Sequence, residues 1–72
     1  MPIKENILPY NLTAREFEVL KLLLKAKTNI EIADELFIST NTSKAHVTSI
    51  IKKFGAKDRI EVIIKALNDG CF

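Results

Sequence analysis

Short hydrogen-bonding side chains are concentrated between residues 39 and 49, where they flank a single lysine, Lys44. The hydroxyl and amide groups of this stretch belong to Ser39, Thr40, Asn41, Thr42, Ser43, Thr48 and Ser49. Such residues are mediocre helix formers, and a helix face that meets only water more often carries Glu, Lys, Gln and Arg. Groups this short can approach base edges and phosphates without clashing. The stretch therefore indicates either a surface that reads nucleic acid or a helix that simply tolerates Ser and Thr.

The charge pattern points to the same part of the chain. The formal net charge is only +2, but residues 36–57 contain no Asp or Glu and carry Lys44, Lys52, Lys53 and Lys57. A domain that is nearly balanced overall and locally basic suits one face that meets a polyanion. A solvated lysine face is the alternative interpretation of the charges alone.

No pattern of residues predicts an enzyme, a metal site or a cofactor. The chain has one histidine, His46, and one cysteine, Cys71, whereas structural zinc needs about four ligands and a nucleophile needs a base held beside it. A single cysteine excludes an internal disulfide and suits a reducing compartment. No apolar run approaches the roughly 18–20 residues of a membrane span. We therefore expect a cytoplasmic protein with no catalytic residue, cofactor or membrane contact.

The 72 residues have room for one domain, with residues 1–11 as an arm or linker and residues 12–72 as the folded part. Apolar residues recur with helical spacing, and no segment alternates with the period of a strand. The predicted fold class is therefore all-α, a bundle of four helices. Capping residues mark the four helix starts, and glycines close the last two helices: Thr13 with Glu16, Thr28 with Glu31, Ser39, Asp58 with Glu61, and then Gly55 and Gly70.

The second and third helices are joined by residues 37–39 alone, and so short a turn is typical of a helix-turn-helix motif. Each residue turns a helix by about 100°, so Lys44 and Thr48 lie together on the outward side of the third helix, with Ala45 beside them. The major groove of B-DNA admits such a helix, whose amino-terminal half reads the bases. The motif thus favours DNA recognition by the third helix.

Two apolar strips run along the predicted fourth helix. The strip expected to face the core contains Ile60, Ile63, Ile64 and Leu67. The other strip contains Val62 and Ala66. Together with Cys71 and Phe72, which follow Gly70, it is expected to form a homodimer interface. Two copies that meet across a two-fold axis place their recognition helices about one DNA turn apart. A helix broadly buried within one subunit is the alternative.

From residue 12 to residue 72 the chain resembles the LuxR-type regulators, a family that includes the NarL-like output domains of response regulators. The similarity runs in order and without obvious gaps, and the short chain resembles the free-standing members of the family, which lack a receiver domain. The matching stretches are LTAREFEVL at 12–20, NIEIA at 29–33, LFIS at 36–39, TSKAHV at 42–47, KFGA at 53–56, and Arg59.

This resemblance implies a DNA-binding domain of a transcriptional regulator that acts as a homodimer through its fourth helix. By position, it assigns base reading to Lys44, Ala45 and Thr48, and contacts with the DNA backbone to Lys27, Asn29, Thr42 and Lys53. Besides double-stranded DNA, it adds a receiver domain, a sensor domain or RNA polymerase as candidate partners. The alternative function is a protein-interaction module of the same fold that docks to another regulator without binding DNA.

Several positions depart from the family pattern. Ser43 replaces the usual Val on the inner side of the third helix, where we expect its hydroxyl to bond back to a carbonyl of the preceding turn. Ala26 stands where Gly is frequent, and is expected only to lengthen the first helix. Ile30 replaces a commonly basic residue, which indicates a lost phosphate contact. Thr48 replaces a longer polar or basic residue, which indicates either an altered DNA preference or a lower affinity. An ion pair among Arg15, Glu16 and Arg59 is expected to join the first and fourth helices.

Overall fold

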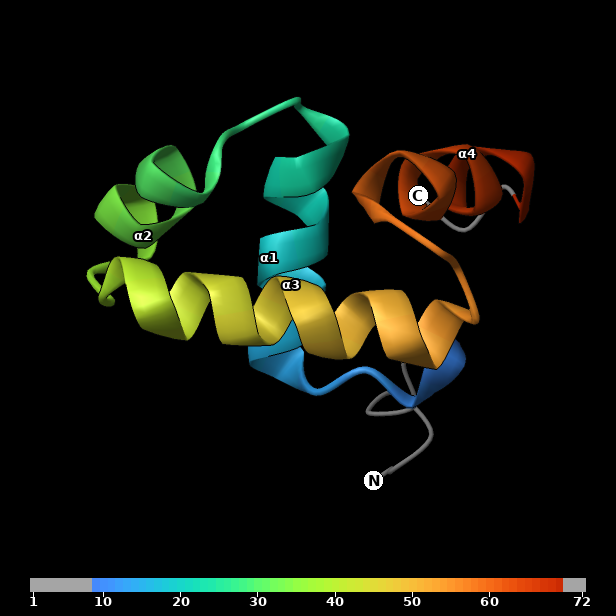
Figure 1. The fold of residues 1–72 in the computed structure, drawn as a ribbon, viewed down its shortest axis with the longest axis horizontal. Coiled ribbons are helices and arrows are strands. Elements are labelled where there is room, and N and C mark those ends of the chain that lie inside the picture. Colours follow the sequence, from blue (N-terminus) through green and yellow to red (C-terminus); the bar gives the residue numbers. More distant parts are fainter. Residues whose placement is uncertain (1–8, 70–72) are drawn as a thin grey trace, which may run out of the picture.

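The computed structural model describes residues 9–69, which fold into helices without a strand. A short 3-10 turn, η2 (Pro9–Asn11), precedes α1 (Ala14–Leu24), α2 (Asn29–Leu36), α3 (Thr40–Phe54) and α4 (Arg59–Asp69). Figure 1 shows α3 in yellow across the front of the molecule, with α1 crossing behind it and α2 and α4 toward its two ends. The helix α3 contacts α1, α2, α4 and η2. The predicted all-α, four-helix fold class is confirmed.

Each predicted helix start is present, because a side chain satisfies amides that the helix itself leaves free. Thr13 and Thr28 each form a complete capping box with the glutamate three residues later. At α3, the Ser39 hydroxyl accepts a 3.0 Å hydrogen bond from the Thr42 N–H. At α4, the backbone N–H of Glu61 donates to the Asp58 carboxylate, 2.8 Å away.

A residue in the left-handed conformation follows each of the first three helices, namely Ala26 (φ 62°), Phe37 (φ 57°) and Gly55 (φ 65°). In the first case the amides of Ala26 and Lys27 donate back to the carbonyls of Leu23 and Leu22, at 2.8 and 3.1 Å. These two crossed bonds stop α1 at Leu24, so the expectation that Ala26 lengthens the first helix is wrong. An alanine held at this φ is strained, since left-handed backbone costs a side-chain-bearing residue about 1–2 kcal/mol.

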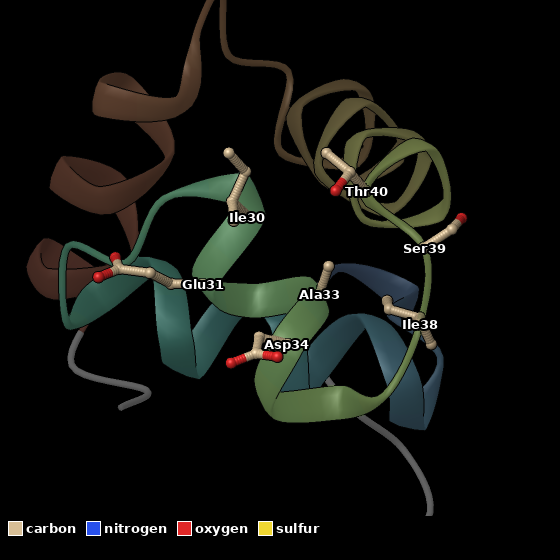
Figure 2. A pocket seen from close by; sticks show the side chains of 7 residues that line it. All are labelled: Ile30, Glu31, Ala33, Asp34, Ile38, Ser39 and Thr40. Atoms are coloured by element: carbon tan, nitrogen blue, oxygen red, sulfur yellow. The ribbon is translucent and has the colours of Figure 1, made fainter.

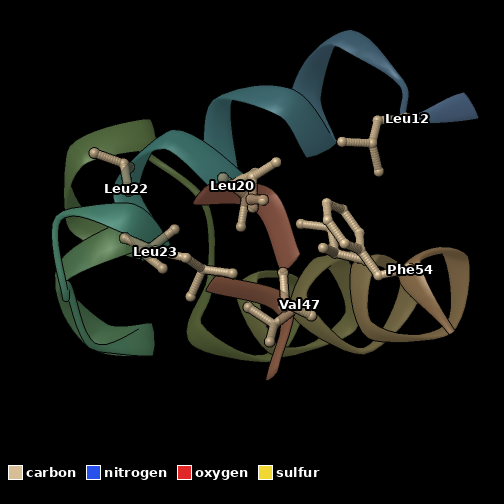
Figure 3. Packing of buried hydrophobic residues seen from close by; sticks show 11 residues of the cluster. Leu12, Leu20, Leu22, Leu23, Val47 and Phe54 are labelled. Atoms are coloured by element: carbon tan, nitrogen blue, oxygen red, sulfur yellow. The ribbon is translucent and has the colours of Figure 1, made fainter. Parts of the chain in front are cut away.

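The core lies where α1, α3 and α4 meet, and Figure 3 shows its apolar side chains converging. Tyr10 extends it toward the amino terminus, because its ring stacks on Phe54 with centroids 4.0 Å apart. The Tyr10 hydroxyl also donates a hydrogen bond to Asp69 at the end of α4. The buried cluster contains Leu12, Val19, Leu20, Leu22, Leu23, Ile32, Val47, Ile50, Phe54, Val62 and Ala66.

The predicted orientation of α4 is wrong. Val62 and Ala66, expected on the outside, are completely buried against the core. Exposure is instead 64% at Ile60, 53% at Ile64 and 60% at Leu67. Both strips satisfy the helical period, so periodicity alone does not decide which one faces inward. The small side chains of Val62 and Ala66 are the ones that face the core, and Ile63 is half-buried.

Ser43 is completely buried on the inner side of α3, as the spacing predicted. Among residues 9–69 its hydroxyl has no hydrogen-bond partner, so the expected bond to a carbonyl of the preceding turn is wrong. A buried polar group without a partner costs roughly 1–3 kcal/mol, so this position weakens the fold.

We therefore expect Ser43→Ala to raise the free energy of unfolding by about 1 kcal/mol, because it removes an unsatisfied hydroxyl. Ser49→Ala is the matched control. It makes the same change in helix propensity within α3, but it deletes a hydroxyl that donates to Glu16 at 2.6 Å, and should destabilise the fold. Urea unfolding of both variants measures the difference. A Ser43→Ala protein less stable than the wild type would contradict this account of the core.

Candidate nucleic-acid interface

The side of α3 that points away from the core is exposed along its length. We define the outer face of α3 as Asn41, Lys44, Ala45, Thr48 and Lys52, all of which are exposed. The opposite side of the helix is buried through Ser43, Val47, Ile50 and Phe54. All three residues assigned to base reading, Lys44, Ala45 and Thr48, thus lie together on one accessible face.

The electrostatics of this face are those of a cationic surface. The helix α3 contains no acidic residue. In the described part of the chain, neither Lys44 nor Lys52 forms an ion pair; the ion pairs there are Arg15–Glu18, Lys27–Glu35 and Lys53–Glu16. The ammonium group of Lys44 is therefore free to meet an anionic ligand.

Thr42 lies in the first turn of α3, beside this face. Its side chain is exposed, and its hydroxyl oxygen accepts a 2.9 Å hydrogen bond from the Ser39 hydroxyl. This hydrogen bond uses one lone pair of the Thr42 hydroxyl oxygen. The same Ser39 cap holds the Thr42 N–H in the first turn. Its contact with the DNA backbone stays a prediction.

Lys27 and Asn29 lie at the junction of α1 and α2, where Arg59 holds them. The guanidinium group of Arg59 donates to the Lys27 carbonyl at 2.7 Å and to the Asn29 side-chain oxygen at 3.4 Å. The Lys27 ammonium group lies 3.4 Å from the Glu35 carboxylate. Arg59 therefore joins α4 to the start of α2, and does not form the expected ion pair with Glu16. The phosphate contacts of Lys27 and Asn29 stay predictions.

Lys53 points toward α1 instead of sharing the outer face of α3. Its ammonium group lies 2.7 Å from the Glu16 carboxylate and donates to the Asn11 carbonyl at 3.1 Å. The same carboxylate accepts hydrogen bonds from the Ser49 hydroxyl and from the backbone N–H of Thr13, the N-cap residue of α1. Arg15, the other residue of the expected ion pair, pairs with Glu18 at 3.3 Å. We call Glu16, Ser49 and Lys53 the Glu16 cluster.

The Glu16 cluster fixes α3 against α1. Sequence reasoning missed it because Glu16 was assigned to a cap and to an ion pair with Arg15 and Arg59, and not to partners on α3. Burial alone would raise the pKa of this carboxyl, but the hydrogen bonds from Lys53, Ser49 and the Thr13 amide, with the positive charge of Lys53, lower it to about 2. The carboxylate therefore stays charged and paired at neutral pH. The cluster therefore fixes the orientation of α3, and with it the direction in which the outer face of α3 points.

A surface pocket lies between the start of α2 and the start of α3, and Figure 2 shows the side chains that line it. Glu31 and Asp34 make its α2 side acidic, and Ile30 is 70% exposed at its edge. No cation lines the pocket. Ile30 therefore brings no positive charge to this pocket, and position 30 itself offers no cation to a phosphate.

An apolar stripe occupies the exposed side of α4. Ile60, Ile64 and Leu67 follow one another at helical spacing, and each is more than half exposed. Of the residues first assigned to a dimer interface, Val62 and Ala66 belong to the core instead, because their side chains are inaccessible to a partner. Cys71 and Phe72 lie outside the described residues.

The described residues contain no cluster of His, Cys, Asp and Glu that could hold a metal ion. Over the same residues, no helix has the length and apolar character needed to cross a membrane. Half-buried His46 is the one histidine of the chain.

Comparison with known proteins places this arrangement in a family. Residues 10–66 match the family described as bacterial regulatory proteins, luxR family. The chain is 46% identical to the transcriptional regulatory protein LiaR of Bacillus subtilis over 63 residues, which are 86% of this chain and 30% of LiaR. It is 44% identical to the spore germination protein GerE of the same organism over 59 residues, 82% of this chain and 80% of GerE. Identity to the oxygen regulatory protein NreC of Staphylococcus aureus is 45% over 56 residues, 78% of this chain and 26% of NreC.

Proposed function

Because the chain belongs to the luxR family of bacterial regulatory proteins and has its helix-turn-helix DNA-binding domain, we propose that it binds a specific duplex DNA sequence as a homodimer. In this proposal the amino-terminal half of α3 lies in the major groove, where Lys44, Ala45 and Thr48 meet the bases. Thr42, with Asn29 and Lys27 near the start of α2, contacts the backbone. The protein acts in the cytoplasm as a transcriptional regulator.

One observation carries this proposal: α3 presents Lys44 and Thr48 on an exposed face without a carboxylate. Lysine pairs with the O6 and N7 atoms of guanine, and the methyl groups of Ala and Thr suit the thymine methyl. Within the described residues Lys44 has no ion-pair partner, so its charge is available to the DNA polyanion. The chain spans less than a third of LiaR and of NreC, so partners such as a receiver domain, a sensor domain or RNA polymerase belong to the proposal.

Homodimerisation through α4 is supported by the exposed apolar stripe of Ile60, Ile64 and Leu67. Apolar side chains in such a row favour a partner surface of the same kind. A two-fold axis along this stripe brings two copies of α3 to half-sites about 34–36 Å apart, which is one turn of DNA.

The proposal is tested by selecting bound duplexes from a random pool and measuring the affinity for the selected sequence. We expect Lys44→Ala to weaken binding to the selected site by roughly 1–3 kcal/mol per subunit, about 5- to 150-fold, and to weaken binding to unrelated DNA less. Lys25→Ala is the matched control, since this exposed lysine at the end of α1 lies off the outer face of α3. Equal losses for both variants, or failure to recover any preferred sequence, would refute specific recognition by α3.

A further inference from the structure

Two adjacent lysines close to the end of α3 have different surroundings. Lys52 belongs to the outer face of α3, is exposed, and forms no ion pair within the described residues. Lys53 is turned by about 100° around the helix and is bound to Glu16 and to the Asn11 carbonyl. Sequence similarity assigned a DNA backbone contact to Lys53 and none to Lys52.

We infer that Lys52, and not Lys53, binds a phosphate of the DNA backbone where the carboxy-terminal end of α3 leaves the groove. This inference rests on the proposed function, because it requires α3 to lie in the major groove. The ligand is a phosphodiester of either strand, bound through charge and without regard to the base sequence.

The position of Lys52 along α3 suits a backbone contact better than a base contact. Lys44 and Lys52 are eight residues apart, which is about 12 Å along an α-helix. The major groove is itself about 12 Å wide. When the axis of α3 runs obliquely across the groove with Lys44 at the bases, this distance brings Lys52 to the groove edge, where the phosphates lie.

Lys53 is poorly available to bind a phosphate because its ammonium group is already paired with Glu16. Its ammonium group lies 2.7 Å from a carboxylate that is only 7% exposed. Moving that ammonium group to a phosphate would leave Glu16 buried without its cation, and an unpaired buried charge is strongly unfavourable. Lys52 has no ion pair to give up within the described residues, so its contribution to DNA affinity is not offset by a broken ion pair.

The experiment measures DNA affinity against salt concentration, because each neutralised phosphate changes the slope of log K against log salt by about 0.9. For the wild type and variants, the duplexes are one selected site and one unrelated sequence. We expect Lys52→Gln to reduce the slope by about 0.9 per bound subunit on both duplexes. Lys52→Arg should restore the slope, and Lys25→Gln should leave it unchanged.

Lys53→Gln separates the two lysines. It is expected to lower the unfolding midpoint, since Glu16 loses its cation, and to keep the wild-type salt slope at temperatures where the variant is folded. Should it fail to fold, the double variant Glu16→Gln/Lys53→Gln removes both charges together and provides the same measurement. An unchanged slope for Lys52→Gln, or a reduced slope for a folded protein without Lys53, overturns the inference.

Failure of the proposed function gives a different result. If the wild-type protein binds neither duplex in a salt-dependent manner, the DNA-binding proposal is wrong and the inference falls with it. If the wild type binds with a steep salt dependence to which Lys52 contributes nothing, DNA binding stands and only the assignment to Lys52 is wrong.

Discussion

Val62→Glu is expected to unfold the domain. The Val62 side chain is completely buried among the apolar residues of the core, where an unpaired carboxylate is very unfavourable. Changes of this kind are among those that cost more than about 4 kcal/mol, and a chain of this length has a total stability of only about 4–11 kcal/mol. Circular dichroism at neutral pH should show the loss of the helical signal.

Ile64→Glu provides the comparison on the same helix. Ile64 is 53% exposed on the apolar stripe of α4, so a glutamate there can remain in water and should change the stability of the subunit little. We expect the variant to stay helical, to sediment as a monomer where the wild type forms a dimer, and to bind a two-half-site duplex more weakly. A wild-type sedimentation profile for Ile64→Glu, or a folded Val62→Glu protein, would contradict the orientation of α4 or the proposed interface.

The second large effect is expected at Glu16, whose pKa lies at about 2 in the folded protein against an ordinary value of 4.5. Because the unfolded chain binds the proton more readily, this residue stabilises the fold fully above pH 4.5, and the stabilisation is lost as the pH falls toward 2. The shift corresponds to a contribution of about 3 kcal/mol at neutral pH. Urea unfolding of the wild type between pH 7 and pH 2 should therefore show a marked loss of stability below pH 4.5.

Glu16→Gln isolates this contribution. The amide keeps the size of the side chain but abolishes the ion pair with Lys53, so we expect a loss of about 3 kcal/mol at pH 7 and a flatter pH profile between 4.5 and 2. Glu18→Gln serves as the control, because this exposed residue forms only a surface ion pair with Arg15, of a kind worth about 0–1 kcal/mol. A Glu16→Gln protein as stable as Glu18→Gln would show that the Glu16 cluster does not hold α3 against α1.

The helix starts were predictable because a cap is a local feature. Thr13 and Thr28 each precede a glutamate by three residues, and the bonds of a capping box involve only those few residues. The outer face of α3 followed equally well, since the apolar residues of one helix define its inner side, and the remaining side must face the solvent.

Features that depend on two segments distant in the sequence were not predictable in this way. In α4 both apolar strips have the helical period, and only packing against residues distant in the sequence shows that Val62 and Ala66 face inward. The Glu16 cluster joins residues more than thirty positions apart, so no local spacing reveals it. At Ala26, helix propensity favoured continuation of α1, whereas the crossed hydrogen bonds to Leu22 and Leu23 end it.

The helix α3 contacts every other helix of the described domain, and it is also the helix proposed to enter the groove. A rigid shift of α3 would therefore disturb the whole apolar interior, so the chain has little freedom to adjust its fit to DNA by moving this helix alone. Substitution of outward-pointing side chains, such as Ala45 and Thr48, can instead change the DNA sequence that the domain prefers. Such substitutions leave the packing of the four helices unchanged. The preferred DNA sequence of such a domain can therefore change without a change of its fold.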